Sequence, residues 1–313
     1  EAPTNKKPIN LHTYVSGKIE NAVGYLTAFH SYVFDGVKGV LQTLLNALEA
    51  VFVGTPWPIM MGALLAIAYY AAGLRIASFV GLSLGYLAFF GFWITAMETL
   101  TLVASATCVA IVIGLPLGIW VGKSKRGKAI VTPILDMMQT IPSFVYLLPA
   151  IAFFGIGVVP GILATVTFAM PPMVRLTSLG IQHVPESTKE AALAFGANPR
   201  QLLTKVELPL AMPSIMAGVN QVVMMSLSMV VVAALIGAGG MGFLVTDALA
   251  RTDTGKGVLA GVGIALLAMM IDRVVQKANK TEKLGPICLV PNNSLPANEV
   301  RKMTILKTRP APH

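Results

Sequence analysis

The fold is decided by the stretch Glu190-Ala191-Ala192-Leu193-Ala194-Phe195-Gly196 and its continuation Val206-Glu207-Leu208-Pro209. This stretch is polar enough to sit in water, yet it lies between two long apolar segments. Its local chemistry predicts two short helices joined by a turn. We expect Pro209 to close the unit, because a helix rarely continues into the residue before a proline.

Local capping chemistry sets the expected helix ends. Ser187 and Glu190 stand three residues apart, which is the spacing of a capping box at the start of the first helix. Gly196 can adopt the left-handed conformation that ends a helix cheaply. Asn198 can cap the second helix, with Pro199 in its first turn, where the missing N–H costs nothing.

The first of these helices carries small residues beside one large aromatic. Ala191, Ala192 and Ala194 would let another surface approach the backbone closely, and Phe195 could anchor in a pocket of that surface. The pattern favours a docking helix. An ordinary amphipathic loop helix is the alternative that these residues leave open.

The composition predicts an integral membrane protein. Hydrophobic residues make up 55% of the 313 residues, charged residues make up 12%, and the mean hydropathy is +0.73. A soluble domain has about 25% charged residues. The net charge of +9 would favour nucleic-acid binding in a soluble chain. Here the basic residues cluster in short loops between apolar stretches, which favours membrane topology and no nucleic acid.

A membrane-spanning helix needs roughly 20 apolar residues, and seven stretches are candidates. They cover residues 56–73, 76–94, 97–121, 130–154, 158–180, 213–236 and 257–273. Before them, residues 32–53 predict an amphipathic helix that lies along the membrane surface. Residues 237–242 are glycine-rich and predict an external turn or a short re-entrant segment.

The basic residues in short loops predict the orientation of the spans. They follow the third, fifth and seventh spans, whereas the loop at 155–160 has none. We therefore expect the N-terminus outside and the C-terminus in the cytoplasm. The residues that carry this argument are Lys123, Lys125, Arg126, Lys128, Lys189, Arg200, Lys205, Arg273, Lys277 and Lys280.

Glycines, prolines and polar residues within the spans suggest packing faces and a pathway. Gly114, Gly118 and Gly122 repeat every fourth residue, which favours close helix packing. Prolines interrupt the fourth and fifth spans, and broken helices can line a pathway; these are Pro142, Pro149, Pro171 and Pro172. The tentative pathway residues are the polar groups of the fourth and sixth spans, namely Gln139, Tyr146, Asn220, Gln221, Ser226 and Ser228. Each could instead bond a neighbouring helix.

Several functional classes find no support in the residues. Segment 122–129 resembles a phosphate-binding loop, but Ala129 stands where Ser or Thr is needed for magnesium. The two cysteines, Cys108 and Cys288, and the four scattered histidines show no metal-ligand spacing. No nucleophile–base pair stands out, so we expect no enzyme, metal or cofactor. The spans also lack a series of buried carboxylates, which argues against a proton-driven secondary carrier.

The opening stretch resembles the signature of binding-protein-dependent ABC importer permeases: Glu-Ala-Ala, three residues, Gly, nine residues, then apolar-x-Leu-Pro. Val206 is the one departure, where the family pattern usually has Ile. The resemblance implies that the first helix is a coupling helix, which docks on a cytoplasmic ATPase. The residues it marks for coupling are Glu190, Ala191, Ala192, Phe195, Gly196, Val206, Leu208 and Pro209.

From about residue 98 to 273 the chain resembles the permease of glycine betaine/proline betaine importers of the ProW type. Three stretches carry this likeness: 135–147 with 175–177, 195–201, and 208–221. The resemblance implies an all-α, MetI-like permease core in a bacterial inner membrane. It also implies a homodimer in contact with membrane lipid, two cytoplasmic ATPase subunits, and an outside binding protein that holds a quaternary ammonium compound by cation–π attraction.

The expected organisation follows from both lines of reasoning. Residues 1–55 are an outside extension, 56–96 two accessory spans, 97–275 the permease core with a coupling loop at 181–212, and 276–313 a disordered cytoplasmic tail. The expected function is import of betaine-type osmolytes, with ATP hydrolysed by a partner subunit. A choline or carnitine importer of the same architecture is the alternative, followed by an ATP-independent carrier or channel.

Overall fold

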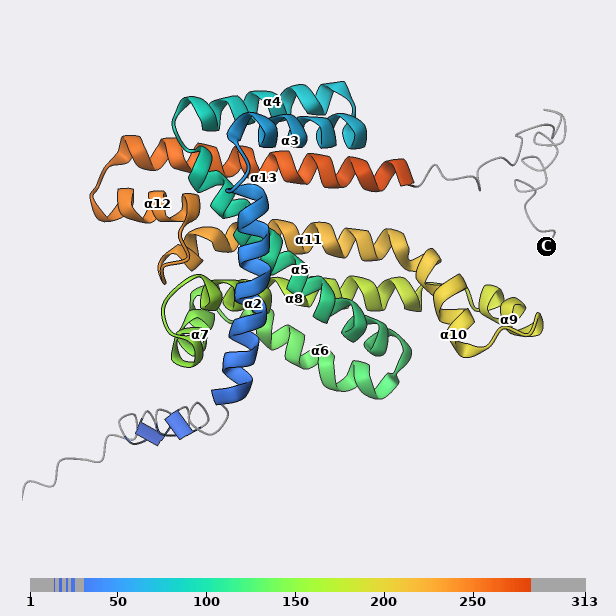
Figure 1. Ribbon diagram of the computed structural model, residues 1–313. Coiled ribbons are helices and arrows are strands. Elements are labelled where there is room, and N and C mark those ends of the chain that lie inside the picture. The colour runs from blue at the N-terminus through green and yellow to red at the C-terminus, as the bar shows by residue number, and fades with distance from the viewer. Residues whose placement is uncertain (1–13, 15–16, 19–20, 22–23, 26–30, 283–313) are drawn as a thin grey trace, which may run out of the picture. The chain divides into compact units, whose positions relative to one another are not determined.

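The computed structural model describes residues 14, 17, 18, 21, 24 and 25 and the continuous segment 31–282 (Figure 1). Every regular element in this part of the chain is a helix, as the sequence predicts. The first half comprises α2 (Ser31–Phe52), α3 (Trp57–Ala72), α4 (Leu74–Phe89), α5 (Trp93–Lys123), α6 (Lys125–Thr140), a 3₁₀ turn (Ser143–Tyr146) and α7 (Leu147–Phe154).

The second half begins with α8 (Val158–Gln182), which is followed by the two short helices α9 (Glu186–Ala194) and α10 (Pro199–Leu202). A π-helical turn (Leu203–Glu207) leads into α11 (Leu208–Ala234). The chain then forms α12 (Gly240–Ala250) and α13 (Thr254–Glu282). The helix α13 therefore includes the first residues of the expected tail at 276–313, and the remainder of that tail lies outside the described residues.

Within the described residues, four helices are long and apolar enough to cross a membrane, and up to six spans result if each of two bent pairs counts as one. The pairs are α2 with α3, bent by 96°, and α6 with α7, bent by 109°. The sequence predicts seven spans, and the difference lies in α4, which has 16 residues. Hydropathy alone extends this span to residue 94, whereas Gly91 at φ +73° separates α4 from α5.

The predicted break in the fourth span is confirmed at Pro142 and wrong at Pro149, which lies inside α7. Ile141 is extended, with ψ 129°, because the ring of the following proline disfavours the helical conformation. The predicted interruption of the fifth span is wrong. Pro171 and Pro172 both lie inside α8, which continues from Val158 to Gln182.

The glycine row of the third span packs α5 against α8, as predicted. A β-carbon on Gly118 would lie 2.6 Å from the Cβ of Thr177, and one on Gly114 would lie 3.0 Å from the Cγ of Met173. Gly122 continues the same face one turn further. The absence of side chains at these positions lets the two backbones approach closely, which is the usual role of small residues between membrane helices.

The amphipathic helix α2 forms as predicted, and its apolar side contacts protein. Leu41 and Leu45 are buried in one hydrophobic cluster with residues of α5, α8 and α11. At its other end, Phe34 stacks on Phe153 of α7, with ring centroids 5.0 Å apart. Figure 1 shows α2 crossing in front of the long helices. The core of the fold is therefore made by α5, α8 and α11, with α2 against it.

Candidate functional site

The helix α9 begins at Glu186, directly after Pro185, and its first turn has no side-chain cap. The predicted capping box of Ser187 and Glu190 is therefore wrong. Pro185 has φ −56° and ψ 133°, so it serves as the flanking residue itself and places Ser187 inside the first turn. Proline at this boundary needs no hydrogen bond for its own nitrogen.

The turn between α9 and α10 forms as the sequence predicts. Gly196 has φ +83°, a left-handed conformation that favours glycine. The Asn198 side chain accepts a hydrogen bond of 2.8 Å from the Gln201 N–H, and the Gln201 side chain accepts one of 3.0 Å from the Asn198 N–H. This reciprocal pair is a capping box, and it fixes the direction in which α10 leaves the turn.

The chain does not end its helix before Pro209, contrary to prediction. Helical structure runs without a break from Pro199 to Ala234, through the π turn and into α11. Pro209 occupies the first turn of α11. A π turn contains one residue more than an α-helical turn. After it, α11 begins afresh at Leu208, so Pro209 lies in a first turn, where a missing N–H is tolerated.

The surface of α9 is open. No residue of this helix is buried, and Phe195, which follows it, is 93% exposed. Leu193 is also exposed, and Ala192 is half-buried. Figure 1 shows α9 and α10 beyond the C-terminal end of α8 and the N-terminal end of α11. An exposed aromatic beside small residues is suited to docking on another protein.

Polar contacts join the helices at and below this segment, and one of them involves the segment itself. The Lys123 ammonium, at the end of α5, lies 2.9 Å from the Glu207 carboxylate, whose side chain is 5% exposed. Nearby, the Lys128 ammonium donates to the Gln182 side chain at 2.9 Å, which joins α6 to α8. Sequence reasoning missed both pairs, since neither partner lies near the other in sequence.

The six tentative pathway residues fall into two groups. Gln139, Gln221 and Ser228 are exposed in the single chain. The other three lie within the protein: Tyr146 donates to the Met138 carbonyl, Asn220 donates to Asp272 at 3.3 Å, and the buried Ser226 hydroxyl has no hydrogen-bond partner among the described residues. Sequence reasoning missed the partner carboxylate Asp272 and the ion pair of Arg175 with Asp136.

The expected turn at 237–242 extends only to Gly239, because the helix α12 begins at Gly240. Residues of α5 bind the N-terminus of α12. The Glu98 carboxylate accepts a 3.1 Å hydrogen bond from the Gly240 N–H, and the Thr99 hydroxyl accepts a 2.8 Å bond from the Met241 N–H. A β-carbon on Gly240 would lie 2.6 Å from the Thr99 hydroxyl oxygen. Glycine is therefore required there both by space and by its φ of +69°.

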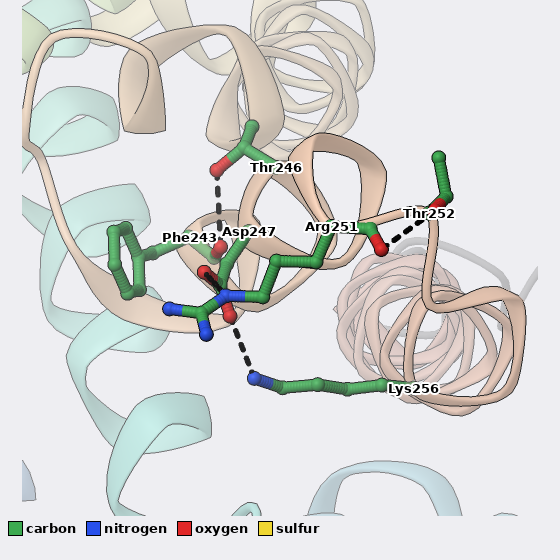
Figure 2. Close-up of polar contacts among 6 residues, drawn as sticks. All are labelled: Phe243, Thr246, Asp247, Arg251, Thr252 and Lys256. Carbon is green, nitrogen blue, oxygen red and sulfur yellow. Dashed lines mark hydrogen bonds and ion pairs between the residues drawn. The ribbon is translucent and has the colours of Figure 1, made fainter.

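The turn from α12 to α13 is closed by a charged cluster (Figure 2). The Asp247 carboxylate contacts the Arg251 guanidinium at 2.7 Å and the Lys256 ammonium at 2.8 Å. Hydrogen bonds from Lys256 and then Arg251 hold the pKa of Asp247 below its ordinary value of 3.8. Among the described residues, no group of three or more His, Cys, Asp or Glu side chains could hold a metal ion.

Comparison with known proteins confirms the family resemblance that the sequence motifs predict. A family model described as the binding-protein-dependent transport system inner membrane component matches residues 114–279. The chain is 44% identical over 281 residues to the glycine betaine/proline betaine transport system permease protein ProW of Escherichia coli, covering 90% of this chain and 78% of that protein. It is 44% identical over 273 residues to the glycine betaine/carnitine transport permease protein GbuB of Listeria monocytogenes, covering 85% and 95%.

The fold is also similar to that of a solved transporter. An inward-facing structure of the MetNI methionine ABC transporter aligns with a TM-score of 0.51 at 24% identity, covering 58% of this chain and 93% of that chain. The likeness supports the MetI-like core predicted from the sequence. The family match and the two relatives show that this chain belongs to the inner membrane components of binding-protein-dependent transport systems.

Proposed function

We propose that this chain is the membrane-spanning subunit of an ATP-driven importer of glycine betaine and related osmolytes. The exposed helix α9, with Phe195 93% exposed behind it, carries the proposal. A helix that presents small residues and a free aromatic outside the membrane bundle needs a partner, and an ATPase subunit would supply one. The chain itself would hydrolyse nothing and would bind no cofactor.

The coupling surface comprises the residues that the signature marks, and they divide by role. Glu190, Ala191, Ala192 and Phe195 belong to the docking face, and Gly196 makes the turn behind it. Val206 and Leu208 are half-buried, and Pro209 lies in the first turn of α11. We infer that this second group anchors the docking face to the membrane helices.

The translocation pathway would form between two copies of the chain. Gln139, Gln221 and Ser228 are exposed on spanning segments, where neutral polar groups are costly against lipid. A second copy would shield them and leave weakly polar walls, which suit a zwitterion with a cationic head. Tyr146, Asn220 and Ser226 would support this wall from behind through contacts within the chain.

The proposed topology places the N-terminus outside and α9 and the C-terminus in the cytoplasm of a bacterial inner membrane. The basic residues at the ends of α5, α8 and α13 support this orientation through the positive-inside rule. In this arrangement residues 1–55 form the outside extension, 56–96 the accessory helices and 97–275 the core. A binding protein would dock on the outer side and membrane lipid would surround the helices.

Carnitine is the specific alternative to glycine betaine as the transported substrate. Glycine betaine appears in the names of both relatives described above, and carnitine appears in one of them. Both compounds carry a quaternary ammonium and a carboxylate, so the same neutral walls would pass either. Choline lacks the carboxylate, which makes it the natural discriminating compound.

The deciding experiment is uptake of labelled glycine betaine into vesicles that contain this chain, with and without the ATPase and the binding protein. We expect uptake only with both partners and ATP, and competition by carnitine. Uptake by the chain alone would contradict the proposal and favour a carrier or channel. Competition by choline alone would retain the importer and change its substrate.

A further inference from the structure

Lys123 and Glu207 link α5 by their side chains to a segment whose backbone continues only into α8 and α11. We call residues 186–207, which contain α9, α10 and the π turn, the coupling unit. The Glu207 side chain belongs to this unit, is 5% exposed and lies 2.9 Å from the Lys123 ammonium. No hydrogen bond from the described residues reaches that carboxylate oxygen, so the ammonium neutralises a buried charge.

The Lys123 side of this pair is anchored on close-packed helices. A β-carbon on Gly122, the preceding residue, would lie 3.2 Å from the Cβ of Ile181. The helices α5 and α8 are therefore in close contact beside Lys123. Gly180 meets α11 as closely, since a β-carbon there would lie 2.8 Å from the Cβ of Ser214. Packed interfaces of this kind resist gradual sliding. The ends of α5, α8 and α11 therefore act as one rigid base.

The Glu207 side of the pair lies in a π turn. Glu207 is the last residue of the π turn, in which the Leu208 N–H donates to the Leu203 carbonyl five residues earlier. Such turns are rare and occur frequently at functional sites. Tightening this turn into an α-helix would rotate α9 and α10 relative to α11. The backbone joins this segment to α8 and α11, and the Lys123–Glu207 contact adds a direct link to α5.

We propose that the Lys123–Glu207 ion pair is the strut that transmits movement of the coupling unit to α5, and hence to the membrane helices. The inference rests on the proposed importer function and assigns Lys123 and Glu207 as positioning residues for it. Removing one partner leaves the other charge without its counterion in a confined place, which displaces the carboxylate. The coupling unit would then move with the ATPase without its direct link to α5, so less of that movement would reach the membrane helices.

The test uses the full transporter in vesicles, with ATPase and binding protein, and measures molecules imported per ATP hydrolysed. The variants are Lys123→Gln, Glu207→Gln, the two together, and the exchange of Lys123→Glu with Glu207→Lys. We expect each neutral variant to hydrolyse ATP while importing about fivefold or more fewer molecules per ATP, the scale of a typical coupling energy. The exchange should recover most of the ratio, because the pair is re-formed.

Lys125→Gln is the matched control. Lys125 is exposed, lies two residues from Lys123 and forms no ion pair with the described residues, so its ratio should equal that of the unmodified chain. Should a single variant fail to fold, the double neutral variant keeps the site free of unpaired charge and measures the same ratio. A crosslink from Ala192→Cys to the ATPase groove should persist in every variant, which separates loss of transmission from loss of docking.

The outcomes separate the strut from the importer. Coupled import by the unmodified chain, together with unchanged ratios in the neutral variants, would overturn the strut alone. Reduced ratios that the charge exchange fails to recover would also overturn it, because an ion pair tolerates reversal whereas a purely steric role does not. An unmodified complex without ATP-dependent uptake would contradict the importer, and the strut with it.

Discussion

Thr177 of α8 lies directly against Gly118 of α5, so close that a β-carbon on the glycine would stand 2.6 Å from the Thr177 Cβ. Thr177 itself is fully buried. The contact brings the buried faces of α5 and α8 together at the base of the coupling unit. The close packing of α5 on α8 therefore requires a residue without a side chain at position 118.

Gly118→Ala should destabilise the protein by about 1–3 kcal/mol, because a methyl group in a filled contact forces the helices apart. Thermal unfolding in detergent would measure the loss. Gly85→Ala in α4 is the matched control, since nothing lies within 4 Å of a β-carbon there. Equal melting temperatures for the two variants would contradict the close packing of α5 on α8.

Thr99→Val should loosen the start of α12. The change removes the acceptor of the Met241 N–H in a buried place, and a buried donor without a partner costs about 1–3 kcal/mol. Thr101→Val is the control, because the Thr101 hydroxyl only donates to the Met97 carbonyl of its own helix. Unfolding measurements and hydrogen exchange at residues 240–243 should separate the two variants. Identical behaviour would argue against the α5 cap.

Gly196→Val should impair transport much more than Gly196→Asn. A left-handed conformation, with φ +83° here, costs a residue with a side chain about 1–2 kcal/mol, and asparagine tolerates it better than a β-branched residue. No atom lies within 4 Å of the site, so the difference reports backbone strain alone. Uptake and membrane insertion should be measured together. Normal uptake by the valine variant would remove the turn from the coupling assignment.

Phe195→Ala should weaken binding of the ATPase by about 2 kcal/mol, which is the scale of an anchoring aromatic at an interface. Phe89→Ala in α4 is a suitable comparison, because Phe89 is also an exposed aromatic, at 85%. Binding of purified ATPase to each variant in nanodiscs provides the measurement. If both variants bind as tightly as the unmodified chain, Phe195 is not the anchor.

The α12–α13 turn should open only in acid. The folded pKa of Asp247 lies below its ordinary value of 3.8, so its stabilising effect is complete above pH 3.8 and is lost as the pH falls through the lower folded value. Hydrogen exchange at residues 250–257, corrected for intrinsic pH effects, should rise in that range. Asp247→Asn should show the raised exchange at neutral pH and no further change in acid. A pH-independent turn in the unmodified chain would refute this.

Local chemistry made part of the candidate site predictable. Asn198 and Gln201 lie three residues apart and form the capping box through that spacing, and Gly196 adopts the positive φ expected of a helix end. The box expected at Ser187 failed although it obeys the same rule. The helix begins earlier, after Pro185, so the N–H groups that the Ser187 side chain would have bonded donate to backbone carbonyls within the helix instead, as the Lys189 N–H does to the Pro185 carbonyl. Two valid signals competed, and spacing alone could not rank them.

By itself the sequence determined the membrane class, the long helices, the glycine packing face and the signature stretch, because hydropathy, periodicity and backbone preference act over a few residues. Only the tertiary structure decided that helix continues through Pro209, that Glu98 holds α12 and that Lys123 meets Glu207. The partners in the last two contacts are separated by more than 80 residues. Such pairs depend on how whole helices pack, and no local pattern records that packing.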